Sequence, residues 1–181
     1  MNEQKSEAEL QIREEVADQL VDHIRLVEFY IRQLTGEATR RAERHDESKW
    51  SKEEWDLFLK YTPKLKNCTY GSPEYLKYLK ELKPALDHHY QCNRHHPEHH
   101  MHEGIGDMNL VDILEMLCDW LASTKRHADG DIFKSIEINQ KRFGYSDDLK
   151  NILKNTACWL TYKNVVKELK EKKNEGTEKS N

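Results

Sequence analysis

Histidine is concentrated in one internal segment of this 181-residue chain. Seven of the ten histidines lie between His88 and His102, and several of them fall three, four or seven residues apart, on a common helical face with Cys92. Imidazoles one or two helical turns apart can converge on an ion, or can act as acid, base or phosphate partner. We therefore predict metal ligands among His88, His89, His95 and His96. The alternative is a solvated polar helix followed by a histidine-rich loop.

A second candidate is the adjacent pair His45-Asp46. An imidazole nitrogen and a carboxylate oxygen together suit divalent ions such as Zn, Mn, Fe or Co. Neighbouring side chains on a helix point about 100° apart, so further ligands must come from other helices. The alternative is a helix-terminal histidine followed by a cap. Asp119 is the candidate for a further ligand, on the polar side of a helix; that side either faces a polar cavity or is simply exposed to solvent.

His23 lies on the apolar stripe of the first expected helix, beside Leu20 and Val27. A lone histidine on such a stripe is more often a hydrogen-bonded core residue than a ligand. One unbroken helix would separate His23 from His45 by about 33 Å, at a rise of about 1.5 Å per residue. The two can share an ion only if the chain turns back between them, and Gly36 is the obvious place for that turn.

Several polar side chains are candidates for binding the oxygens of a phosphate group. Lys49 follows His45 by one turn, and it either neutralises a phosphate or pairs with a neighbouring glutamate. Arg126 and Arg142 flank a segment whose apolar stripe contains Asn139, and a buried asparagine needs a protein or ligand partner. The alternative is that these cations are ordinary helix-end residues. We expect Lys49, Arg126, Asn139 and Arg142 to form a substrate-binding set.

Composition favours one all-α domain with a charged surface. Apolar residues make up 36% of the chain and charged residues 34%, which is typical of helices with Lys and Glu on their exposed faces. The net charge of -4 gives no electrostatic signal for nucleic acid. No apolar run approaches the ~20 residues that span a bilayer. The polar N-terminus does not resemble a secretory signal, and the four cysteines form no CxxC pair, so we expect a cytoplasmic protein with reduced thiols.

The periodicity of apolar residues predicts helices and leaves no convincing strand pattern. We expect a domain over residues 1–169 and a disordered charged tail over 170–181. A capping box of Ser51 and Glu54 is expected to open the second long helix, and Asn109 is expected to cap the helix that carries Asp119. Helices are expected at about 6–34, 37–44, 49–60, 73–83, 84–96, 109–124, 131–142 and 146–169, and loops at 62–73 and 99–107. Pro84 is expected either to start a helix or to kink one.

In order along the chain, His23, His45-Asp46 and Asp119 resemble the H…HD…D pattern of the HD-domain metal-dependent phosphohydrolases. The histidines between His88 and His96 fall where two-metal members of that family carry extra ligands. In those relatives the two extra histidines are usually further apart than His88 and His95, so which of them are ligands stays open. The HD-domain phosphohydrolases are helical, mostly cytosolic enzymes that often cleave nucleotides, and the resemblance implies the same for this chain.

A closer resemblance covers nearly the whole chain before the tail. The stretches HDESKW, TYGSPEY, ALDHHYQCNRHHPEH, MNLVDILEMLCDW and GDIFKSIEINQKRFG are similar to those of an uncharacterised family found in bacteria and their phages. We associate no established activity with that family. The resemblance therefore implies a genuine domain without naming a reaction.

The leading hypothesis is a metal-dependent phosphohydrolase that acts on a nucleotide or another small phosphate ester. It would use one or two divalent ions (Zn, Mn, Fe, Co or Mg), with Asp46 and Lys49 in catalytic roles. The first ion would be bound by His23, His45, Asp46 and Asp119. His88 or His89, with His95 or His96, would either bind a second ion or orient the phosphate. The alternatives are a di-iron HD-type oxygenase and a non-enzymatic metal-binding or regulatory helical module. The oligomeric state stays open.

Overall fold

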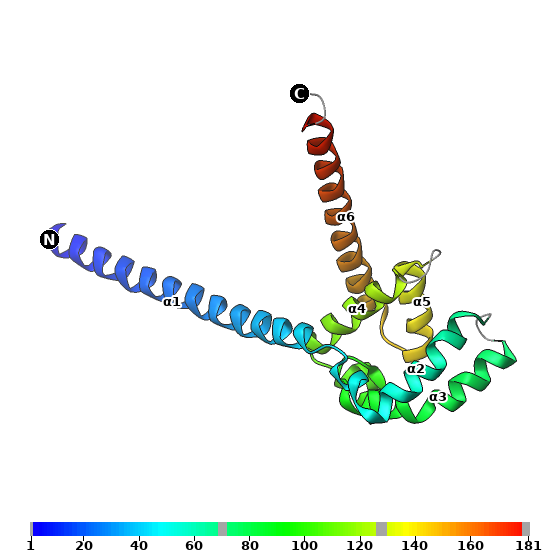
Figure 1. The fold of residues 1–181 in the computed structure, drawn as a ribbon. Coiled ribbons are helices and arrows are strands. Elements are labelled where there is room, and N and C mark those ends of the chain that lie inside the picture. The colour runs from blue at the N-terminus through cyan, green and yellow to red at the C-terminus, as the bar shows by residue number, and fades with distance from the viewer. Residues whose placement is uncertain (1, 69–71, 126–129, 179–181) are drawn as a thin grey trace. The chain divides into compact units, whose positions relative to one another are not determined.

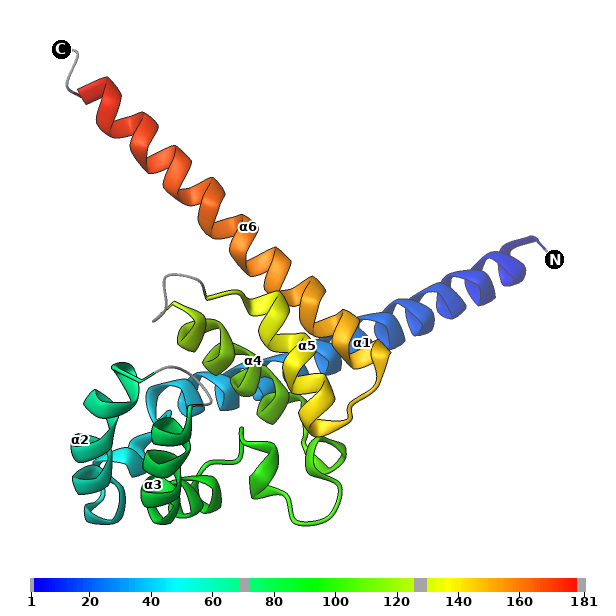
Figure 2. The same cartoon turned by 90° about the vertical axis from the view of Figure 1, so that its right-hand side faces the viewer.

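The computed structural model is all-α, as the sequence predicts (Figures 1 and 2). It describes the backbone of residues 2–68, 72–125 and 130–178, and the side chains of residues 7–68, 72–125 and 130–162. Within these ranges the chain forms α-helices and short 3-10 helices, and no strand. The chain divides into two units, Met1–Arg44 and His45–Asn181, and each is described by itself.

The first unit is a single helix, α1 (Asn2–Glu43). The expected interruption at Gly36 is wrong, because the helix runs through this glycine without a break. One glycine costs a helix only about 1 kcal/mol relative to alanine, which a long helix can absorb. His23 therefore lies about 30 Å along the axis from Glu43, at a rise of about 1.5 Å per residue. The turn that would let His23 share an ion with His45 is absent.

The second unit begins with a turn at His45 and Asp46, then the 3-10 helix η1 (Glu47–Trp50) and the helices α2 (Lys52–Lys66) and α3 (Pro73–Cys92). α2 and α3 pack against each other around buried Tyr61, Leu82 and Ala85. Two sequence-based boundaries are wrong. α2 continues to Lys66 with Pro63 inside it, and α3 is one helix with Pro84 inside it, so neither proline ends or restarts a helix.

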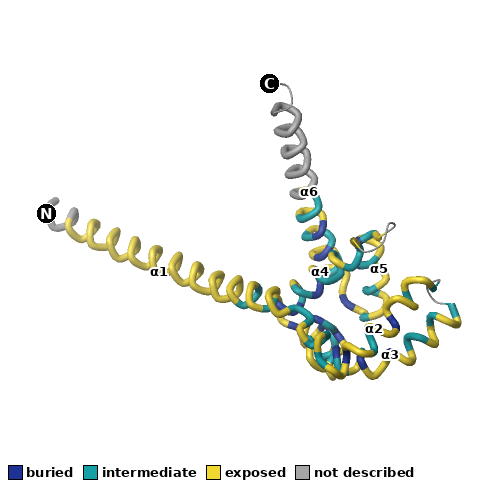
Figure 3. Tube along the Cα trace, in the orientation of Figure 1, coloured by how far each residue is buried: buried dark blue, intermediate teal, exposed yellow. Residues whose placement is uncertain are grey.

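The second half of this unit packs α4 (Leu110–Thr124), α5 (Ile132–Phe143) and α6 (Asp147–Glu178) around a separate apolar core. Met116, Ile136 and Leu153 are the largest of its fully buried apolar side chains. The predicted cap of α4 is confirmed: Asn109 accepts hydrogen bonds from the first turn as one half of a capping box. Figure 3 marks the buried residues along the trace of this unit.

The connection from α3 to α4 contains most of the histidine-rich segment. Two 3-10 helices, η2 (Pro97–His99) and η3 (Gly104–Asp107), lie within it, where a loop was expected. His99 and His100 each contact a backbone carbonyl, those of Tyr90 and Arg94, at 3.0 Å. These two histidines therefore help to hold the connection, as expected for loop residues.

At the C-terminus, α6 includes most of the segment expected to be a disordered tail. The domain limit at residue 169 stays a prediction. Among the described residues, no helix is both long and apolar enough to span a membrane.

Candidate metal centre

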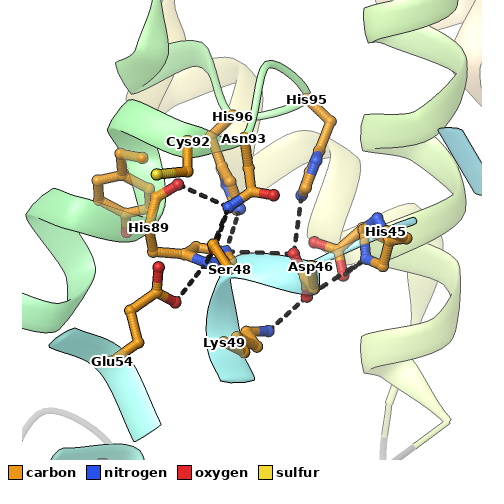
Figure 4. A network of polar contacts seen from close by, with 12 residues as sticks. His45, Asp46, Ser48, Lys49, Glu54, His89, Cys92, Asn93, His95 and His96 are labelled. Carbon is orange, nitrogen blue, oxygen red and sulfur yellow. Dashed lines mark hydrogen bonds and ion pairs between the residues drawn. The ribbon is translucent and has the colours of Figure 1, made fainter. Parts of the chain in front are cut away.

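Histidines and carboxylates from four places in the second unit meet around Asp46 (Figure 4). The turn before η1 supplies His45 and Asp46, the last turns of α3 supply His89, the connection after α3 supplies His95 and His96, and α4 supplies Glu115 and Asp119. Asp46 occupies the N-cap position of η1, but its side chain makes no capping hydrogen bond. Asp46 therefore has the cap position of the alternative interpretation, but its carboxylate does not cap the helix and is available to the histidines.

One carboxylate oxygen of Asp46 faces the mid-chain histidines. Asp46 Oδ1 lies 3.3 Å from His89 Nε2 and 3.6 Å from His95 Nε2, and His96 Nε2 lies 2.9 Å from His89 Nε2. The four residues can offer one atom each within 4.8 Å of one another. In a tetrahedral zinc site the ligand atoms lie about 3.3 Å apart, because each nitrogen is about 2.0–2.1 Å from the metal. We call Asp46, His89, His95 and His96 the inner histidine group. The atoms of this group have the spacing of a metal site.

The other oxygen of Asp46 faces a second group. His45 Nε2 lies 3.3 Å from Asp46 Oδ2 and 3.7 Å from Asp119 Oδ1, and the three residues together meet the same distance condition. The ammonium group of Lys49 also contacts Asp46 Oδ2. Asp46 thus lies between an imidazole-rich group and a carboxylate-rich group, with one oxygen directed to each.

Two further carboxylates lie behind the imidazole rings and hold them in orientation. Glu115 Oε1 contacts Nδ1 of His45 at 2.8 Å and Nδ1 of His95 at 3.1 Å. Glu54, which is fully buried, contacts Nδ1 of His89 at 3.0 Å through Oε2. In a neutral imidazole, a carboxylate that accepts a hydrogen bond from Nδ1–H leaves Nε2 without a proton and so able to bind metal. All three rings consequently direct Nε2 toward Asp46.

The electrostatics of the cluster favour an ionised Asp46 and an uncharged His96. Burial alone would raise the pKa of Asp46, but the nearby polar groups of His45, His89 and Lys49 outweigh it and hold that pKa well below its ordinary value. Burial, followed by electrostatic repulsion from the neighbouring His95 and His89 rings, lowers the pKa of His96 to about 3. His96 is therefore neutral at physiological pH, with a lone pair free to bind an ion.

His45 behaves in the opposite way. Contacts with Asp119, then with Asp46 and Glu115, raise its pKa from 6.5 to about 11. Burial alone would raise the pKa of the Asp119 carboxyl, but the hydrogen bond from His45 outweighs burial and lowers that pKa overall. Without an ion, the protonated His45 ring therefore supplies positive charge between the carboxylates. An ion in this group would have to displace that proton.

Two buried atoms at the centre of the cluster have no hydrogen-bond partner: Asp46 Oδ1 and His95 Nε2. A buried polar atom without a partner is costly, at about 1–3 kcal/mol, and native proteins rarely keep one without reason. Both atoms belong to the inner histidine group and both are metal-binding atom types. A divalent ion would satisfy the two together, so the residues present fit a metal.

The structure brings together most, but not all, of the sequence-predicted residues. His45, Asp46, Lys49, His89, His95, His96 and Asp119 converge in this cluster. His88 lies at its edge and contacts Glu54 at 2.7 Å instead of Asp46. His23 belongs to the other unit, where it lies within the unbroken helix α1.

The predicted substrate-binding set is only partly assembled. Of its members, Lys49 lies in the cluster. Arg142 forms an ion pair with Glu98 in η2, beside the histidine-rich connection. Asn139 contacts Ser135 on its own helix at 3.4 Å, and none of its described contacts reaches the cluster. Arg126 lies outside the described residues.

Sequence reasoning missed the two orienting glutamates as functional residues. Glu54 was expected to form a capping box with Ser51, yet Ser51 makes no side-chain cap hydrogen bond and Glu54 contacts two histidines. Glu115 precedes Asp119 by four residues, which places both on one face of α4. That spacing was a usable signal for Glu115. For Glu54 the sequence offered none, since its spacing suits a cap equally well.

A comparison with family models matches residues 13–159 of the chain to a family described as "Family of unknown function (DUF5662)". The chain belongs to this family. The match spans α2 to α5 and therefore every residue of the cluster around Asp46. Neither the curated proteins nor the solved structures contain a match to this DUF5662 protein.

Proposed function

We propose that this DUF5662 protein is a metal-dependent phosphohydrolase. The observation that carries the proposal is the position of Asp46, whose two oxygens face two different groups of ligand atoms. A carboxylate placed in this way can bridge a pair of ions. Pairs of divalent ions about 3.5–4 Å apart are a common means of hydrolysing phosphate esters.

The ligand types indicate which ions the two groups would hold. The inner histidine group offers three imidazoles and one carboxylate, which suits Zn, Fe, Mn or Co. The second group offers His45 with two carboxylates, a harder set that also accommodates Mn and, more weakly, Mg. When bound, such an ion supplies Lewis acidity, which favours hydroxide near neutral pH and polarises a phosphoryl oxygen. One or two ions would therefore be bound at Asp46.

The remaining charges of the site suit an anionic substrate. The ammonium of Lys49 lies beside Asp46, and its side chain is only 35% exposed. With an ion bound at Asp46, this ammonium would no longer be needed as the counter-charge of the carboxylate and could contact a phosphoryl oxygen. Lys49 would thereby orient the substrate and stabilise the additional negative charge of the transition state. A nucleotide or another small phosphate ester is the substrate class that these charges support.

The order of His45-Asp46 and Asp119 along the chain, with histidines between them, also supports the proposal, since it resembles the HD-domain phosphohydrolases. His23 departs from that resemblance, because α1 does not turn back at Gly36. Glu115 takes part in this structure by holding His45 and His95. The proposal thus rests on the cluster itself and needs no contribution from His23.

The experiment that tests the proposal is elemental analysis of untagged protein beside an Asp46→Asn variant, followed by assay on a panel of phosphate esters. Asp87→Asn is the matched control, because Asp87 is a half-exposed carboxylate of α3 that pairs with Lys83. We expect stoichiometric metal and phosphate release in the wild type and the control, and loss of both in Asp46→Asn.

Each other outcome would contradict the proposal in a distinct way. Equal metal content in all three proteins would show that Asp46 is not a metal ligand. Metal in none of them would show that the protein does not bind metal. Bound iron with oxygen consumption and no phosphate release would indicate an oxygenase. Bound metal with no turnover on the whole panel would indicate a binding or regulatory module.

A further inference from the structure

A third group of possible ligands lies next to the inner histidine group. Glu54, His88 and Cys92 can offer one atom each within 4.8 Å of one another. His88 Nδ1 lies 2.7 Å from Glu54 Oε1, and Cys92 Sγ lies 3.7 Å from His88 Nε2 and 3.9 Å from Nδ1. None of the interactions described above for the cluster at Asp46 involves Cys92. We call these three residues the outer thiol group.

The spacing of this group along the chain favours a bound ion. His88 and Cys92 are four residues apart on α3, so their side chains lie one above the other on one helix face. In a tetrahedral zinc site, sulfur and nitrogen ligands lie about 3.5 Å apart, given Zn–S of about 2.3 Å and Zn–N of about 2.0–2.1 Å. Nδ1 of His88, the ring nitrogen beside Glu54 Oε1, lies 3.9 Å from Sγ, so binding one ion with all three residues needs only a small side-chain adjustment.

The ligand types distinguish the outer thiol group from the centre at Asp46. The groups around Asp46 contain nitrogen and oxygen ligands alone, whereas the outer group contains a sulfur. A thiolate selects soft or borderline ions such as Zn²⁺ and excludes Mg²⁺ and Ca²⁺. Cys92 is exposed, so an ion can enter from solvent and water can complete its coordination. Glu54, in contrast, is fully buried and directs Oε1 toward His88.

Glu54 connects the two sites. Its Oε1 contacts His88, while its Oε2 contacts His89 of the inner histidine group. The same carboxylate therefore holds one ring of the outer group and one ring of the inner group. An ion that takes Oε1 as a ligand draws negative charge away from the hydrogen bond to His89, and that bond keeps His89 Nε2 directed at Asp46.

We propose that Glu54, His88 and Cys92 form an outer binding site for Zn²⁺ or a similar thiophilic divalent ion, and that Glu54 couples this site to the centre at Asp46. On binding, the Cys92 thiol loses its proton to solvent and the thiolate joins the ion, together with a nitrogen of His88 and an oxygen of Glu54. Filling the outer site loosens His89 and weakens the inner centre. Excess zinc therefore acts as an inhibitor.

The test of the site uses Co²⁺ as a spectroscopic substitute for zinc, in the full chain. We expect the wild type to bind one Co²⁺ with the thiolate-to-cobalt charge-transfer absorption. Cys92→Ser should lose that absorption and bind one ion fewer. Cys158→Ser is the matched control, because Cys158 is an exposed cysteine of α6 outside every ligand group of the described residues. Its absorption should equal that of the wild type.

Two results would overturn the outer site. One is a charge-transfer absorption that persists in Cys92→Ser. The other is its absence from the wild type when all the Co²⁺ that the protein can bind has been added. Circular dichroism serves as the control that each variant is folded. This test requires no catalytic activity, so it can succeed or fail independently of the proposed function.

The coupling rests on the proposed function and is tested by inhibition. We expect excess Zn²⁺ to inhibit phosphate release by the wild type and by Cys158→Ser. In Cys92→Ser the inhibitory concentration should rise by at least about tenfold, as expected when a group that supports metal binding is removed. Equal inhibition of all three proteins would show that the outer site does not act on the centre at Asp46.

Discussion

Glu115 offers the most informative single change in the cluster, because one of its oxygens holds two imidazole rings. Oε1 contacts Nδ1 of His45 at 2.8 Å and Nδ1 of His95 at 3.1 Å. In Glu115→Gln the shape is retained, but the negative charge is lost. The amide oxygen can still accept a hydrogen bond from the Nδ1–H groups, whereas the amide nitrogen can only donate. Both rings thus lose the charge that makes Nε2 a strong ligand.

The expected magnitude follows from these two contacts. Removing a carboxylate that orients one metal-binding histidine typically costs 10–100-fold in metal affinity. Glu115 supports two such rings, one in each group, and the amide keeps part of each hydrogen bond. We therefore expect the affinity to fall by about 10–100-fold, which is about 1.4–2.8 kcal/mol at 1.4 kcal/mol per factor of ten.

The assay is a titration of metal-free protein with Zn²⁺ in competition with a chromophoric chelator. Glu137→Gln is the matched control, since Glu137 is a half-exposed carboxylate of α5 that pairs with Lys154. Its affinity should equal that of the wild type. If folded Glu115→Gln binds zinc as tightly as the wild type, then the orientation of His45 and His95 by Glu115 does not support metal binding, and our reasoning about Nε2 is refuted.

Three further predictions concern protonation and stability. The pKa of His45 is about 11 in the folded protein, against 6.5 in the unfolded chain. The protonated His45 ring therefore stabilises the metal-free folded state fully below pH 6.5, and this stabilisation is lost as the pH rises toward 11. Ion uptake must displace the same proton, so calorimetry in buffers of different ionisation enthalpy should detect proton release at pH 7, and uptake without protons would contradict the assignment. Tyr145→Phe removes a hydroxyl that donates to the buried carbonyl of Ile136; we expect a loss of about 1 kcal/mol in urea unfolding, and an unchanged midpoint would show that the bond contributes nothing. Asn109→Ala removes the capping side chain that accepts hydrogen bonds from the backbone N–H groups of Val111 and Asp112. Thermal unfolding should show a decrease of about 1 kcal/mol in the free energy of unfolding. Equal stability of the two proteins would rule out the cap as a stabilising element.

The helical character of the chain could be predicted because apolar periodicity and caps are local signals. Asn109 is an example, since its side chain and the first turn of α4 lie within three residues of each other. The errors arose at glycine and proline. Gly36 and Pro63 were expected to interrupt the helical pattern and Pro84 to start or kink a helix, yet each lies inside a helix. Their local cost was known. At Pro63 and Pro84 the packing of α2 on α3 offsets that cost, and this packing is not visible in sequence.

The candidate site was predictable to the extent that ligand types are distinctive. His45, Asp46 and Asp119 were singled out by residue type and order, and they do meet in space. Which histidines of the central run would face Asp46 could not be decided. His88 and His89 are adjacent on α3, and only the packing of α2 against α3 directs His89 inward and His88 to the edge. Glu54 was hidden for the same reason.

The left-handed backbone at Asp46 limits what can occupy this position. Its φ of 57° is the one positive value among the described residues other than glycine, and only glycine, asparagine and aspartate adopt that conformation readily. A saturation library scored for folding should therefore retain all three residues, whereas the same library scored for bound ion should retain aspartate alone. A relative with asparagine or glycine at this position would keep the fold but lose the bound ion. This single position therefore offers a way to distinguish metal-binding relatives from those that only share the fold.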